Sequence, residues 1–279
     1  MFGPAILVRS LTVPGSRSRG SPNAWQYHSR SDRHSKIACW GILFDLMLAS
    51  PAFRHHADAG KVAFGVNHEM VDFRNNRKKK LDLVVCTPRT AKRGVSMAEL
   101  VDRYGIVLEP HEDALLRSLP VLSEAPVGMV RVALEAKACM TEHLKALPRL
   151  HDELNSSHLT IHGSANHAVA VGFSMVNAAT RFISSDRNKH DLATQPAVVT
   201  THVQPRAVER TLRKLGEIPR RTRPGEEGFD AFGVVLVEMA NDGSPVKLVL
   251  APPAPKPGDI FEYESMINRT VDLYQSRYP

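Results

Sequence analysis

The sequence predicts an α/β protein, in which helices flank a mixed β-sheet. Two apolar runs, residues 83–85 and 132–134, consist almost entirely of aliphatic side chains, as is typical of strands buried on both faces. Segments with helical periodicity alternate with further strand-like runs along the rest of the chain. The 279 residues are enough for one large domain with a sizeable core.

The N-terminal segment differs in composition from the rest of the chain. Residues 1–24 are rich in Ser, Arg, Gly and Pro, which predicts a disordered basic tail rather than a dedicated DNA-binding arm. Residues 25–279 are expected to form a single domain. An insertion at about residues 89–126 separates the two central strands of that domain, and the sequence does not define its role.

The remaining elements are predicted from hydrophobic period and from turn signals. The helices are expected at residues 35–49, 96–104, 111–119, 141–154, 208–215 and 260–278. The strands are expected at residues 61–66, 81–85, 130–137, 169–176, 181–183, 232–239 and 246–250. An Asp242-Gly243 pair between the last two strands predicts a hairpin turn. Three histidines, His158, His162 and His167, are expected in a polar loop.

Charge and cysteine content restrict the class of protein. A formal net charge of +7 favours a polyanionic partner. Cys39, Cys86 and Cys139 lie in apolar segments without C-x-x-C spacing, which is typical of reduced thiols. No apolar run is long enough to span a bilayer, and the first residues lack a signal-peptide pattern. We therefore expect a cytoplasmic protein with no membrane partner.

Charged residues interrupt two of the apolar strands. Asp82 stands in the first strand, and Glu135 and Lys137 end the second. Residues i and i+2 of a strand project to the same face, so Glu135 and Lys137 are expected to point together. A charge in such an apolar run is unfavourable unless it is paired or bound to a metal. If the two strands are neighbours, these three groups meet at one end of the sheet.

This constellation suits metal-dependent hydrolysis of phosphodiesters. Two carboxylates can hold Mg²⁺, for which Mn²⁺ can substitute, and the ion lowers the pKa of an attacking water and screens developing charge. A lysine beside the acids can orient or deprotonate that water. The structural alternative is a surface-exposed E-x-K on an edge strand, with Asp82 capping an unrelated turn.

The pattern D…E-x-K, with each half on a strand, resembles the PD-(D/E)XK nuclease superfamily. The resemblance covers about residues 34–180 and implies a restriction-endonuclease-like core. The acid of the family's motif maps onto Asp82, and its E-x-K maps onto Glu135 and Lys137. Leu81 stands where the motif often has proline, and roughly fifty residues separate the two halves.

The resemblance also implies roles for residues around this constellation. Asp82, Glu135 and Ala136 are the expected metal-binding positions, and Asp45 or Glu69 is a candidate supporting carboxylate. The expected DNA contacts are cationic side chains: Arg30, Arg33, Lys36, Lys78, Lys79, Lys80, Arg220, Arg221 and Arg223. Each phosphate contact would add salt-dependent affinity, although basic runs of this kind are also typical of solvated loops.

The sequence therefore predicts a Mg²⁺-dependent endonuclease that acts on double-stranded DNA, as a type II restriction enzyme or an anti-phage defence nuclease. Double-strand cutting generally needs two active sites, so we expect a homodimer or a larger homo-oligomer. One alternative is a non-specific DNase effector that a small cyclic nucleotide activates. An alternative from another class is a non-catalytic nucleic-acid-binding protein, in which the acids are structural.

Overall fold

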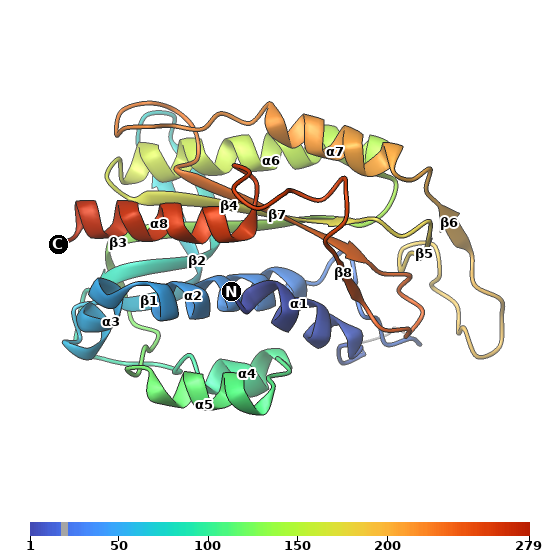
Figure 1. Ribbon diagram of the computed structural model, residues 1–279, viewed down its shortest axis with the longest axis horizontal. Coiled ribbons are helices and arrows are strands. Elements are labelled where there is room, and N and C mark those ends of the chain that lie inside the picture. Colours follow the sequence, from blue (N-terminus) through green and yellow to red (C-terminus); the bar gives the residue numbers. More distant parts are fainter. Residues whose placement is uncertain (18–21) are drawn as a thin grey trace.

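The computed structural model describes residues 1–17 and 22–279, and within these residues the chain forms a mixed six-stranded sheet flanked by helices (Figure 1). The predicted fold class is therefore confirmed. The strands of this sheet are β1 (Ala63–Asp72), β2 (Arg77–Pro88), β3 (Val127–Cys139), β4 (Val169–Asn177), β7 (Ala231–Glu238) and β8 (Lys247–Val249). Strands β5 (Arg181–Ile183) and β6 (Val199–Thr201) pair separately as a short ribbon.

The sheet has the strand order β1-β2-β3-β4-β7-β8. The β1–β2 and β2–β3 pairs are antiparallel, whereas the β3–β4 and β4–β7 pairs are parallel. Strand β8 closes the sheet as the antiparallel partner of β7, and this is the hairpin that the Asp242-Gly243 turn predicted. The parallel step from β3 to β4 needs a crossover, which a long helix provides.

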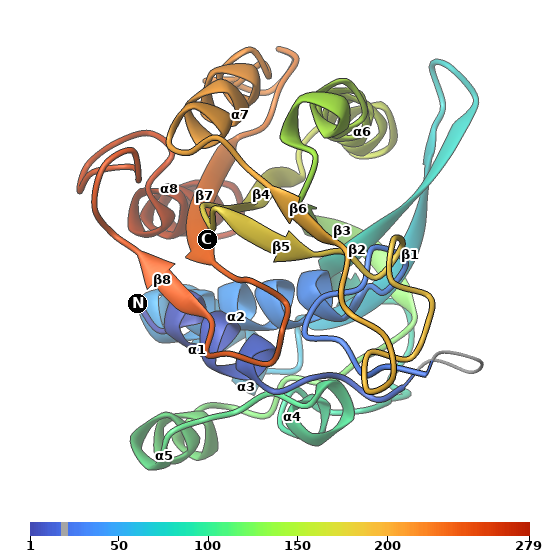
Figure 2. The same cartoon turned by 90° about the vertical axis from the view of Figure 1, so that its right-hand side faces the viewer.

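Helices cover both faces of the sheet (Figures 1 and 2). The helices are α1 (Gly3–Thr12), α2 (Arg33–Ala49), α3 (Pro51–Asp58), α4 (Glu99–Tyr104), α5 (Pro110–Ser118), α6 (His143–Ser164), α7 (Arg206–Gly216) and α8 (Tyr263–Arg277). One core cluster joins the sheet to α1, α2 and α8, and another joins its opposite face to α6 and α7. Because both faces are covered, β4 is buried along its whole length.

The expected disordered tail over residues 1–24 is wrong for its first part. Residues Gly3–Thr12 form α1, which packs on α2. The helix buries one apolar stripe: Ile6, Leu7 and Leu11. The average composition of the segment hid this helical spacing. Part of the same segment, residues 18–21, lies outside the described residues.

The insertion between β2 and β3 carries α4 and α5, which lie below α2 in Figure 1. Just before α4, Ser96 and Glu99 bond reciprocally: the Ser96 N–H donates to Glu99 Oε2 at 2.7 Å, and the Glu99 N–H donates to Ser96 Oγ at 3.2 Å. Trp40 of α2 joins the insertion to the core, because its indole N–H donates to the carbonyl of Met97 at 2.8 Å.

Two elements extend further than the sequence predicted. Helix α6 continues to Ser164, so His158 and His162 lie on a buried helical face and the predicted loop is wrong for both residues. Strand β2 begins at Arg77, so the basic residues before Asp82 belong to a long β1–β2 hairpin rather than to a turn.

Among the described residues, no single helix is long and apolar enough to cross a membrane. In this part of the chain, α2 and α3 taken together have sufficient length and apolar composition, but the pair is bent by 100° at the break.

Candidate active site

Strands β2 and β3 bring Asp82 beside Glu135. The antiparallel register ends with Leu83 opposite Leu134, and Asp82 and Glu135 are the next residues outward. Beyond this pair, a side-chain hydrogen bond links the two strands: Asp82 Oδ2 accepts from the Ala136 N–H at 2.9 Å. The predicted proximity of the two acids is therefore observed.

The predicted lysine shares the face of Glu135. Lys137 Nζ lies 2.8 Å from Glu135 Oε1, and the Glu135 side chain is only 1% exposed. Lys79 Nζ lies 3.6 Å from the same oxygen, so this residue belongs to the charge cluster. The expectation that Lys79 contacts DNA phosphate is wrong, because its side chain turns inward between β2 and α6 and donates to the Glu153 carbonyl at 2.5 Å.

Helix α6 adds an acid that the sequence analysis missed. Glu153 Oε2 lies 3.4 Å from Lys137 Nζ, and its Oε1 accepts a hydrogen bond from Arg149 Nε at 2.6 Å. The buried leucines Leu150 and Leu154 lie on the same side of the helix. This spacing could have predicted the position of Glu153. An acid that follows Leu150 by three residues and precedes Leu154 lies at the edge of the helical face that packs on the sheet.

Burial and mutual charge perturb the two central acids. Burial raises the pKa of Glu135, and the nearby Asp82 carboxylate raises it further, while Lys137 and Lys79 act in the opposite direction. Burial also raises the pKa of Asp82, against the hydrogen bond from Ala136. Two carboxylates in this environment resist carrying full negative charge together, so a cation bound between them would be favoured.

The two lysines respond differently to the same carboxylate. Burial lowers the pKa of Lys137, but the adjacent Glu135 more than offsets burial, and the net pKa lies above the usual range. For Lys79, burial is the largest influence and the net pKa is lowered. Lys137 is therefore the more firmly protonated of the two at neutral pH.

The oxygens present fit a magnesium ion. Glu135 Oε2 is buried and has no hydrogen-bond partner among the described residues. In an extended strand the C=O of a residue points to the same side as its N–H, so the Ala136 carbonyl also faces Asp82. Within the described ranges, no three His, Cys, Asp or Glu side chains converge as a metal cluster. Mg²⁺ needs only one or two carboxylates, because water supplies the other ligands.

A cavity of about 420 Å³ gives access to this cluster. Asp82, Lys137 and Glu153 line it together with the segment before α2 and residues 184–186. His34 lies on its wall, and burial, followed by the charge of Lys137, lowers the pKa of this histidine to about 4. His34 is thus neutral at physiological pH.

The two expected supporting acids lie elsewhere. Asp45 is fully buried and holds the start of α1, because its oxygens accept hydrogen bonds from the N–H groups of Phe2 and Gly3, each at 2.8 Å, and from the Tyr263 hydroxyl at 2.9 Å. Glu69 is on the β1–β2 hairpin, where it pairs with Lys78 at 3.6 Å. Neither acid contacts the Asp82–Glu135 pair, so both expectations are wrong.

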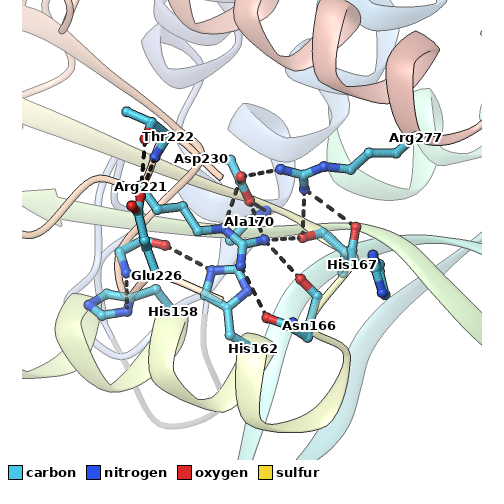
Figure 3. Close-up of polar contacts among 12 residues, drawn as sticks. His158, His162, Asn166, His167, Ala170, Arg221, Thr222, Glu226, Asp230 and Arg277 are labelled. Carbon is cyan, nitrogen blue, oxygen red and sulfur yellow. Dashed lines mark hydrogen bonds and ion pairs between the residues drawn. The ribbon is translucent and has the colours of Figure 1, made fainter. Parts of the chain in front are cut away.

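Arg221 is also not available to DNA. Its side chain is fully buried, and Nε and Nη2 each donate to Asp230 at 2.9 Å (Figure 3). Arg277 donates to the same carboxylate at 2.6 Å. His158 and His162 of α6 join this network by binding the N–H and C=O of Gly228, respectively. The predicted DNA contact at Arg221 is therefore wrong, since a local cluster of arginines does not show which one is buried.

The other predicted DNA contacts divide according to what their side chains touch. Four side chains contact other groups of the chain: Arg33, Lys36, Arg220 and, at the surface, Arg223. Arg33, for example, donates to the carbonyl of Ser10 at 2.8 Å, and Arg220 lies over the Phe261 ring, 4.2 Å from its centroid. The side chains that are exposed at the cavity or on the hairpin are Arg30, Lys78 and Lys80.

Comparison of the chain with protein-family models, with curated proteins and with solved structures finds no significant match.

Proposed function

We propose that this protein is a Mg²⁺-dependent endonuclease that hydrolyses phosphodiester bonds in double-stranded DNA. The observation that supports this most directly is the junction of β2 and β3, where Asp82 lies beside Glu135 and Lys137 lies 2.8 Å from the Glu135 carboxylate. Helix α2 before these strands and helix α6 after Lys137 agree with the restriction-endonuclease-like core that the sequence resemblance implies.

The metal would be held by the Asp82 and Glu135 carboxylates and by the Ala136 carbonyl. When bound, Mg²⁺ lowers the pKa of an attacking water and screens charge on the phosphate. Lys137, whose Nζ lies 2.8 Å from Glu135 Oε1, would orient or deprotonate that water, or neutralise a phosphate oxygen. Glu135 and Glu153 on either side hold the Lys137 side chain in place.

The same proposal covers compartment and assembly. The buried free thiols Cys39, Cys86 and Cys139 agree with a reducing, cytoplasmic environment. We further predict a homodimer or a larger homo-oligomer, because cutting both strands generally requires two sites. Activation by a small cyclic nucleotide also stays a prediction.

Incubation of the purified protein with plasmid DNA and Mg²⁺ tests the proposal. We expect cleavage, and we expect Asp82→Ala and Lys137→Ala each to reduce its rate by roughly a hundredfold or more. Glu238→Ala, which removes an exposed strand carboxylate outside the site, serves as the control and should cleave normally.

Plasmid that stays intact with Mg²⁺ or Mn²⁺, and with cyclic nucleotides added, would contradict the proposal. Metal-independent DNA binding in the same preparation would then favour the non-catalytic nucleic-acid-binding protein. Full activity of the Asp82→Ala variant would show that hydrolysis occurs at another site.

A further inference from the structure

The β1–β2 hairpin ends in an exposed aromatic side chain. Strands β1 and β2 pair from Ala63–Cys86 to Asp72–Arg77, and the hairpin extends past the body of the sheet (Figure 2). At its tip, Phe73 is 77% exposed. This large apolar side chain at the end of a projecting ribbon adds nothing to the core and is accessible to a partner.

The tip contacts α6, because the Phe73 N–H donates to the Gly163 carbonyl at 3.4 Å. Asp72 is 1% exposed, and its carboxylate accepts hydrogen bonds from the Arg74 N–H at 2.9 Å and the Asn75 Nδ2 at 2.8 Å. Gly163 of α6 leaves no room for a Cβ against Asp72, so helix and turn are in direct contact. Phe73 is therefore presented on an ordered turn, anchored to the same helix that carries Glu153.

The side chains around Phe73 are mainly cationic: Arg74, Arg77, Lys78 and Lys80. Two acids offset part of this charge, because the register places Asp72 opposite Arg77 and Glu69 opposite Lys80, and the cations remain in excess. Lys78 and Lys80 alternate with the inward-facing Lys79 and thus project to the opposite side of β2. These two cations therefore lie on the side of β2 opposite the contact between Lys79 and Glu135.

We propose that the tip of the β1–β2 hairpin binds a groove of duplex DNA, with Phe73 against the base stack and the flanking cations on phosphates. This inference depends on the proposed function and specifies its substrate as duplex rather than single-stranded DNA. β-Ribbons enter the major or the minor groove of DNA, and in DNA-bending proteins that bind the minor groove apolar side chains act as wedges between base steps. The cationic surroundings favour DNA over a protein partner.

Fluorescence anisotropy with a labelled duplex and the matching single strand tests this inference on the full chain. Divalent cations are omitted so that no cleavage intervenes. We expect Phe73→Ala to weaken duplex binding by about tenfold, because an aromatic contact with a base contributes about 1–3 kcal/mol. Phe73→Trp should retain binding, and Leu250→Ala, which truncates a side chain that is 79% exposed elsewhere, should have no effect. Lys80→Ala should lower the slope of log K against log salt by about 0.9.

The outcomes separate this inference from the function. Duplex binding by Phe73→Ala equal to that of the parent, while the parent cleaves plasmid, would overturn the hairpin contact and leave the nuclease intact. A loss confined to the single strand would overturn the duplex assignment. If Phe73→Ala changes only the sedimentation of the protein, the tip is a contact between copies of the chain. A parent that neither binds nor cleaves DNA would overturn both proposals.

Discussion

The Arg221–Asp230–Arg277 network leads to a prediction about stability rather than DNA binding. Arg221→Met replaces a fully buried, charged side chain with an uncharged side chain of similar length. Asp230 would keep its bonds to Arg277 and to the Ala170 N–H, at 2.6 and 2.8 Å, but it would lose two hydrogen bonds from Arg221. Breaking a buried ion pair costs about 3–5 kcal/mol, and since Arg277 remains we expect a loss of about 3 kcal/mol.

Urea unfolding monitored by circular dichroism measures this loss. With a urea dependence of about 2–3 kcal/mol/M, the midpoint should fall by roughly 1 M or more. Arg223→Met is the matched control, because Arg223 pairs at the surface with Glu226 and its side chain is 79% exposed. Its effect should stay below about 1 kcal/mol. Equal midpoints for the two variants, with DNA binding lost only in Arg221→Met, would refute the structural role of Arg221.

The pKa of Asp230 defines the pH range of this effect. Burial raises this pKa, but the hydrogen bonds from Arg277 and Arg221 outweigh burial, and the net pKa is lowered. A carboxyl with a lowered pKa in the folded state stabilises the protein above its unfolded pKa, about 4, and loses that contribution only at lower pH. The difference between the Arg221 and Arg223 variants should therefore persist throughout pH 5–8.

Two further predictions concern buried polar groups. Burial, followed by neighbouring charge, lowers the pKa values of His158 and His162 to about 4. Because the unfolded pKa of histidine is about 6.5, the free energy of unfolding should fall as the pH is lowered from about 6.5 to 4. Between pH 7 and pH 5 the loss should be about 2 kcal/mol per histidine. Thermal unfolding at both pH values should show a weaker pH response in the His158→Gln/His162→Gln variant, and an unchanged response would contradict these assignments. Asp45→Asn should weaken the attachment of α1 by about 1–2 kcal/mol, because an amide nitrogen cannot accept the hydrogen bonds that the carboxylate accepts. Amide exchange in α1 should accelerate, and unaltered protection would refute the anchoring role.

Hydrophobic period was sufficient to locate most of the elements that build the site. Strand β4 was visible because it is buried on both faces and mostly apolar, and β3 was visible from the aliphatic run at residues 132–134. The i and i+2 rule placed Lys137 on the face of Glu135, and the adjacency of Asp82 followed once β2 was taken as the neighbour of β3. These inferences used only local geometry and one pairing.

Contacts between residues far apart in the chain could not be predicted from the sequence. Residues 155–158, Asn-Ser-Ser-His, have the composition of a loop, yet they are helical because Leu154 and Ile161 pack on the sheet and His158 binds Gly228. The buried position of Arg221 depends on Asp230 and on the β3–β4 crossover, neither of which a cluster of arginines indicates. In both cases tertiary contacts override the local composition.

Helix α6 connects the candidate site to the projecting hairpin. Near its middle it supplies Glu153, whose side chain binds Lys137 and whose carbonyl receives Lys79. Near its end it contacts the hairpin turn through Gly163, and its buried histidines attach it to the loop before β7. Strand β2 joins Asp82 directly to the tip of the hairpin, and α6 contacts the structure at both places. A substitution that unfolds this half of α6 would therefore disturb hydrolysis and hairpin binding together, whereas Phe73→Ala would disturb binding alone.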